Sequence, residues 1–146
     1  MSIGDRYTPV RIHFRELLID LRDRLRLFIE VLGKQKDAMG REDLAAVRTY
    51  LEQEENILEG ILAFRQPVES WNALYQPSQD PNPEEIRKLK ADIKTLGRQA
   101  KAQSEENQRF LAQRMAIVNA EIQGLKKYRP RNPAGVYHTG SVDITL

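Results

Sequence analysis

Mostly hydrophobic residues recur at alternating intervals of four and three positions between residues 14 and 39, and this spacing leaves little choice of fold. The seam comprises Phe14, Leu18, Leu21, Leu25, Phe28, Leu32, Gln35 and Met39. A heptad pattern held over more than three repeats places these side chains along one side of an α-helix. Three further residues widen the seam into a face, which favours a helix bundle over an isolated two-stranded coiled coil. These are Leu17, Leu27 and Val31.

This first helix is expected over about residues 9–39. Thr8 can cap the free N–H groups at its start, and Pro9 suits the first helical position. Gly40 is a residue type that commonly ends a helix.

A second helix is expected over about residues 43–75, with Asp43 as its N-cap. The short connection from the first helix predicts an antiparallel neighbour. The seam of the second helix is Leu44, Val47, Leu51, Leu58 and Ile61, with Glu54 as a polar interruption. An adjoining line at intervals of seven residues is Tyr50, Ile57, Phe64 and Trp71. Pro67 removes one backbone hydrogen bond, so a kink or break is expected there.

A third helix is expected over about residues 83–128, after a proline-rich loop. Asn82 is its predicted N-cap, Pro83 its first residue, and Glu85 has the spacing of a capping box with Asn82. The first part of its apolar seam is Ile86, Leu89, Ile93 and Leu96. The second part is Leu111, Met115, Val118, Ile122 and Leu125.

The stretch 97–109, between the two parts of that seam, is polar and admits two interpretations. In one, the third helix protrudes past shorter partners and needs no apolar face there. In the other, small and amide side chains at core positions form a buried polar layer that fixes helix register. The residues concerned are Ala100, Gln103 and Asn107.

The predicted fold class is therefore all-α: an antiparallel bundle of three long helices in a domain of residues 1–128, followed by a tail of residues 129–146. The tail has two prolines and two glycines that oppose a helix. It also has an apolar pair, Val136 and Tyr137, and then alternating hydrophobic residues typical of a strand. These are Val142, Ile144 and Leu146. A lone strand is not stable in water, so we expect the tail to be flexible, to pack on the bundle or to bind a partner.

Several function classes find no support in the sequence. Cysteine is absent, and the two histidines, His13 and His138, lie at opposite ends of the chain without a metal-type cluster. No glycine-rich phosphate loop and no convergent acidic pair occurs, so we expect no catalytic residue, cofactor or metal, and no enzyme. Four basic residues within 126–131 lack interleaved aromatics, and we read them as a solvated helix end rather than a nucleic-acid site. No apolar run is long enough for membrane insertion, and no signal peptide is apparent, so a cytoplasmic location is expected.

What remains is a protein that binds other proteins, and the order of its features resembles one family. A short turn at 40–44 joins two leucine-rich helices, Asn107 precedes the apolar pair at 110–111, and Asn119 follows. The third helix ends in the stretch 124–127, and the tail has an apolar–tyrosine pair with a glycine nearby. In combination and in length, the chain resembles the FlgN family of flagellar type III export chaperones, which escort hook-associated proteins.

The resemblance implies that the third helix and the tail bind unassembled hook-associated proteins as cargo and deliver them to the flagellar export apparatus. The implied cargo-binding residues are Asn107, Phe110, Leu111, Met115, Val118, Asn119, Ile122 and Leu125. The implied tail contacts are Val136, Tyr137, Val142, Ile144 and Leu146. We expect a monomer or a weak homodimer. The heptads fit an alternative equally well, a structural coiled-coil adaptor or stalk subunit of a secretion or other assembly, which would form a stable oligomer.

Overall fold

The computed structural model describes residues 3–125, with side chains from Pro9 onward, and this part of the chain is helical almost throughout. Its elements are α1 (Ile3–Gly40), α2 (Leu44–Leu62), α3 (Arg65–Leu74), the short 3-10 turn η1 (Pro77–Gln79) and α4 (Pro83–Gly124). No strand occurs among the described residues, so the prediction of an all-α chain is confirmed. The tail 129–146, the basic cluster 126–131 and His138 lie outside the described residues.

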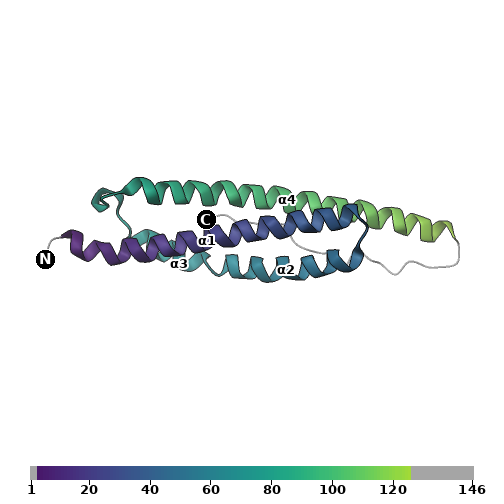
Figure 1. Ribbon diagram of the computed structural model, residues 1–146, viewed down its shortest axis with the longest axis horizontal. Coiled ribbons are helices and arrows are strands. Elements are labelled where there is room, and N and C mark those ends of the chain that lie inside the picture. The colour runs from purple at the N-terminus through teal and green to yellow at the C-terminus, as the bar shows by residue number, and fades with distance from the viewer. Residues whose placement is uncertain (1–2, 126–146) are drawn as a thin grey trace.

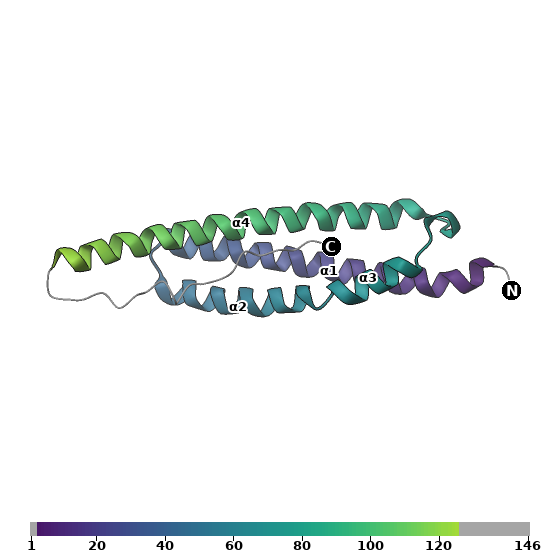
Figure 2. The ribbon, with the colours of Figure 1, turned by 180° about the vertical axis from the view of Figure 1, so that it is seen from behind.

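The helices form an elongated bundle with α1 in the centre. The α1 helix contacts α2 and α3 on one side and α4 on the other, and both views show this order (Figures 1 and 2). Polar contacts that α4 makes with α1 and with the turn after it join residues that are 70 to 75 apart in the sequence. A constant offset means that α1 and α4 run parallel, while α2 and α3 run antiparallel to both. The predicted up-down-up arrangement of three legs is therefore confirmed, with α2 and α3 together as the second leg.

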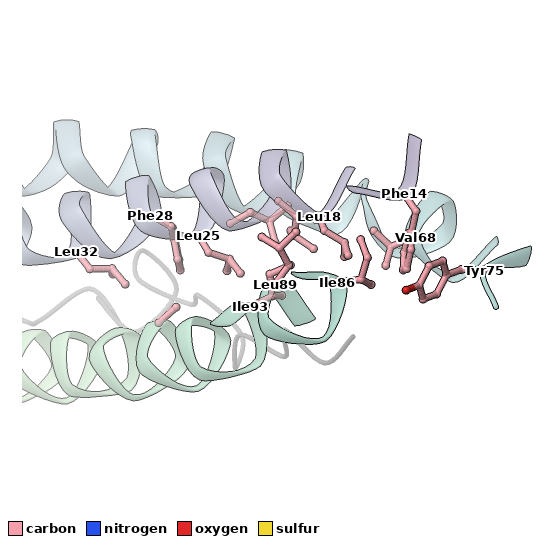
Figure 3. Close-up of a cluster of buried hydrophobic side chains, with 13 residues drawn as sticks. Phe14, Leu18, Leu25, Phe28, Leu32, Val68, Tyr75, Ile86, Leu89 and Ile93 are labelled. Carbon is pink, nitrogen blue, oxygen red and sulfur yellow. The ribbon is translucent and has the colours of Figure 1, made fainter. Parts of the chain in front are cut away.

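The main core lies toward the end of the bundle that holds the α3–α4 loop, which we call the proximal end. Figure 3 shows side chains from α1 and α4 meeting there, with Val68 and Tyr75 from the α3 segment beside Phe14. All eight residues of the predicted first seam are buried, and Phe14, Leu21 and Leu25 have no exposed surface. Burying this many large apolar side chains supplies most of the favourable free energy available to such a bundle.

The first helix differs from its prediction at two points. It begins at Ile3, so that Pro9 lies inside it rather than at its start. The fixed φ of proline is compatible with a helix, and the loss of one hydrogen bond near the helix start does not end it. Leu27, expected on the buried face, is 47% exposed. Because only two legs pack against α1, the buried face is narrower than the spread of its hydrophobic residues.

The second leg breaks where proline predicts. The α2 helix ends at Leu62 and α3 begins at Arg65, which makes Pro67 the third residue of the new helix. The N–H groups of a helix's first turn need no helical partner, so proline is tolerated there. At the other end of α2, the predicted cap is confirmed, because the Asp43 carboxylate accepts a hydrogen bond from the Ala46 N–H at 3.1 Å.

Two predictions about the ends of the later helices were wrong. Leu44, assigned to the second seam, is 75% exposed because it lies in the first turn of α2, where neither α1 nor α4 covers it. The α4 helix does begin at Pro83, but Asn82 makes no side-chain cap, so the predicted capping box does not form. Glu85 instead accepts hydrogen bonds from Arg15 at 2.7 Å and from Arg11 at 3.0 Å. Two guanidinium groups bind its carboxylate in place of the cap.

The inward side of the polar stretch 97–109 is buried, as the layer interpretation expects. Buried polar residues occur at this level of the bundle in all three legs, and we call them the polar layer. They are Gln35, Glu54, Ser104 and Asn107. The Asn107 amide donates to the Leu32 carbonyl at 2.9 Å and to the Gln35 Oε1 atom at 3.0 Å. Beyond the layer lies a second, smaller cluster of Ala38, Met39 and Val47.

Candidate functional site

The last part of α4 extends past the rest of the bundle. An ion pair between Arg114 and Glu42 places the α1–α2 turn level with residue 114 of α4. From there to Gly124, α4 continues for about 15 Å at the usual helical rise, with no other described helix beside it. Figure 1 shows this overhang beyond the turn, at what we call the distal end.

The overhang and the turn before it carry a continuous apolar surface, which we call the distal face. It consists of Phe110, Leu111, Met115, Ile117, Val118, Ile122 and Leu125. Ile117, Val118 and Leu125 are at least half exposed, at 51%, 52% and 64%. Single exposed hydrophobic residues are ordinary, but a contiguous group on one side of a helix indicates a surface that binds a partner.

Most of the residues assigned to cargo binding from the sequence lie on or beside this face. Asn119 is half-buried next to it. Asn107 is different, because it is 2% exposed and its amide is fully engaged in the polar layer. It therefore supports the fold rather than the exposed surface. The assigned tail residues lie outside the described residues.

One residue of the distal face was missed by the sequence reasoning. Ile117 lies off the seam formed by Leu111, Met115 and Val118, and no heptad position marked it. Its spacing of seven from Phe110 was the available signal, because that spacing places both side chains on one line along the helix. The face is therefore wider than the seam alone.

The distal face is held to the rest of the bundle by few contacts. Leu111 packs against the small cluster that contains Met39 and Val47. The Arg114 guanidinium pairs with Glu42 and lies 5.8 Å from the centre of the Phe110 ring. Exposed ion pairs of this kind contribute about 0–1 kcal/mol.

The proximal end is anchored by a buried carboxylate. The Asp80 side chain has no exposed surface, and it accepts hydrogen bonds from Arg11 at 2.7 Å, from the Tyr75 hydroxyl at 2.5 Å and from the Asn82 N–H at 2.8 Å. Burial alone would raise the pKa of Asp80, but these donors outweigh it and hold the pKa below its ordinary value. The network fixes the α3–α4 loop against α1.

The described range, residues 3–125, has no cluster of metal-ligating side chains, since no three His, Cys, Asp or Glu side chains come together there as metal ligands would. His13 stacks on Trp71, with 5.1 Å between the ring centres. Among the described helices, none is both long and apolar enough to cross a membrane.

Comparison with protein families matches residues 13–139 to the FlgN protein family. Searches of curated proteins and of solved structures gave no match. The matched range contains most of α1 and the whole of α2, α3 and α4, and it covers far more than half of the 146 residues. On this match and the helical fold, the chain belongs to the FlgN family of flagellar export chaperones.

Proposed function

We propose that this chaperone binds unassembled hook-associated proteins in the cytoplasm through the distal face, and delivers them to the flagellar export apparatus. The observation that carries the proposal is the apolar overhang of α4, which has no partner among the described helices. An apolar face with anchors at intervals of three and four residues fits an amphipathic helix of a partner protein.

The chemistry of the distal face suits a cargo whose helix is not yet assembled. Met115 lies near its centre, and the flexible thioether of methionine adapts to different apolar surfaces. Val118 and Ile117 provide exposed, β-branched anchors that point about 100° apart around the helix. A cargo helix bound to the distal face would have its own apolar side covered, and the cargo could not use that side to polymerise prematurely.

The test is a binding measurement with hook-associated proteins from the same genome, kept monomeric. Val118→Asp should weaken binding at least about tenfold, because a central anchor typically contributes more than 1 kcal/mol and the new charge must be desolvated. Leu62→Asp is the matched control, since Leu62 is 45% exposed on α2 and away from the distal face. Its binding should be unchanged.

Both residues are exposed, so circular dichroism should report the native helix content for both variants. Equal affinity of the Val118→Asp variant and the unmodified chain would remove the distal face from the proposal. A chain that ends at Leu125 tests the contribution proposed for the tail contacts Val136, Tyr137, Val142, Ile144 and Leu146, and we expect weaker binding from it.

A further inference from the structure

The polar layer separates the interior of the bundle into two packing units. On α1, Gln35 lies between Leu32 of the main core and Ala38 of the small distal cluster. On α4, Ser104 and Asn107 lie between Ala100 of the main core and Leu111. On α2, Glu54 lies between Ile57, which packs on the main core, and Tyr50, which packs on the distal cluster. In every leg, a buried polar side chain interrupts the apolar contacts at the boundary.

The layer itself is only partly satisfied by hydrogen bonds. Asn107 is well bonded, and it also accepts from Gln103 at 2.9 Å. In contrast, the Gln35 Nε2 and Glu54 Oε1 atoms are buried without a hydrogen-bond partner in the structure. A buried polar atom without a partner gains hydrogen bonds to water when the helices separate. The free-energy cost of separating the helices at the polar layer is therefore smaller than in an apolar core.

On the distal side of the layer, α4 is attached by little. Leu111 makes its apolar contact with the small cluster, and an exposed ion pair, Arg114–Glu42, joins α4 to the turn. A second exposed ion pair, Lys36–Glu106, lies at the level of the layer itself. On the proximal side, Ile86, Leu89 and Ile93 are buried in the main core. The proximal part of α4 is therefore fixed by a buried apolar core, whereas the distal part is attached through a small cluster and exposed polar contacts.

We propose that the polar layer is a hinge, at which the part of α4 after Asn107 separates from α1 and α2 while the proximal bundle stays folded. Opening exposes the part of Leu111, a member of the distal face, that packs on the small cluster, and it uncovers Met39 and Val47 on the facing helices. The opened end then offers apolar surface on three helices to an amphipathic helix of the cargo. This last step rests on the proposed function, whereas the hinge itself does not.

The hinge is tested by distances between spin labels, which can be placed cleanly because the chain has no native cysteine. Arg41→Cys with Gln113→Cys reports on the distal end and leaves the Arg114–Glu42 pair intact. Glu16→Cys with Lys88→Cys is the proximal control. All four positions are exposed, and the members of each pair are 72 residues apart on α1 or its turn and α4.

We expect one narrow distance distribution for the proximal pair and a second, longer component for the distal pair. Replacing Asn107 and Gln35 by leucine should join the two clusters and reduce the longer component, with the proximal pair as the check that the chain has folded. A distal distribution as narrow as the proximal one in the unmodified layer would overturn the hinge, whatever the leucine variant does.

Cargo binding then separates this inference from the proposed function. Bridging the distal cysteines with a short bismaleimide should weaken binding of the monomeric hook-associated protein about tenfold, the effect of losing one buried anchor. Bridging the proximal cysteines should leave binding unchanged. Absence of binding by the unbridged chain contradicts the proposed function alone, and full binding by the distally bridged chain contradicts the role of the hinge in cargo binding.

Discussion

The two ends of α4 belong to the same helix but have different physical surroundings. At the proximal end, Ile86 and Ile93 are each 1% exposed, and Glu85 binds two arginines of α1. At the distal end, Val118 is 52% exposed and an exposed ion pair, Arg114–Glu42, joins the helix to the turn. Both ends have hydrophobic residues at the same heptad spacing. What differs is whether another helix is present to cover them.

This difference shows how a small bundle can be stable and still present apolar surface. The proximal core and the Asp80 network hold the three legs together, so the distal end of α4 is not needed to close the main core. Residues that would be a liability on a compact domain can then remain exposed for a partner. The comparison can be tested by perturbing matched residues at each end and at the boundary.

The largest difference is expected for the two phenylalanines on either side of the boundary. Phe14→Ala should lower the free energy of unfolding by about 3–5 kcal/mol, because a fully buried ring leaves a cavity in the main core. Phe110→Ala should lower it by less than about 1 kcal/mol, because this ring is 38% exposed and outside that core. Urea unfolding followed by circular dichroism measures both. Similar losses for the two variants would mean that the ends are equally packed.

A smaller effect, an increase in the free energy of unfolding, is expected from a substitution in the polar layer. Burial raises the pKa of Glu54 to about 8, with a further contribution from Glu55. As the pH rises from about 4.5 to 8, the unfolded chain loses the Glu54 proton while the folded chain keeps it, so Glu54 lowers stability over this range. Glu54→Gln should therefore be more stable than the unmodified chain by about 2–4 kcal/mol at pH 9 and nearly equal at pH 4.

Unfolding curves at several pH values measure this dependence. Glu52→Gln is the control, because Glu52 is exposed on the same helix and should change the curves little. If Glu54→Gln gave the same pH dependence of unfolding as the unmodified chain, Glu54 would not ionise from a buried position. It would then not belong to the polar layer.

The smallest effects should come from the carboxylates that pair with arginine at each end. Asp80→Asn should lower the free energy of unfolding by about 1–3 kcal/mol, because the partly buried Arg11 and the buried Tyr75 lose a charged acceptor. Glu42→Gln should cost at most about 0.5 kcal/mol, since its pair with Arg114 is exposed. Thermal unfolding at pH 7 distinguishes them, and a loss at Glu42 as large as that at Asp80 would contradict the looser attachment of the distal end.

The Asp80 substitution also changes the response to acid. Because the folded pKa of Asp80 is lowered, its contribution is present above its unfolded pKa of about 4 and is lost as the pH falls through the lower, folded value. The Asp80→Asn variant should lose less stability than the unmodified chain on going from pH 4 to more acidic solution.

Much of the fold could be predicted from the sequence because heptad spacing and proline act locally. The buried line from Phe14 to Met39, the break before Pro67 and the Asp43 cap follow from backbone geometry and side-chain periodicity alone. The capping box at Asn82 failed because a distant group intervened. Its partner Glu85 binds Arg11 and Arg15, about seventy positions earlier in the chain, and no local rule includes them.

The candidate site, like the fold, was predicted only in part. The sequence marked the apolar residues of the distal α4, yet it could not separate buried from exposed members of one pattern. Asn107 became part of the interior and Ile117 part of the surface. That outcome depends on where α1 and α2 end relative to α4, which is a property of the assembled bundle.

The sequence by itself determined that this chain forms long amphipathic helices, where they turn and which side of each is apolar, because those features depend on neighbours within a few residues. The tertiary structure decided which apolar stretches are covered. With α1 and α4 parallel and offset by 70 to 75 residues, the α1–α2 turn lies level with residue 114 of α4, and the rest of that helix has no neighbouring helix among the described residues. Register between distant segments, rather than local pattern, is therefore what leaves the distal face exposed.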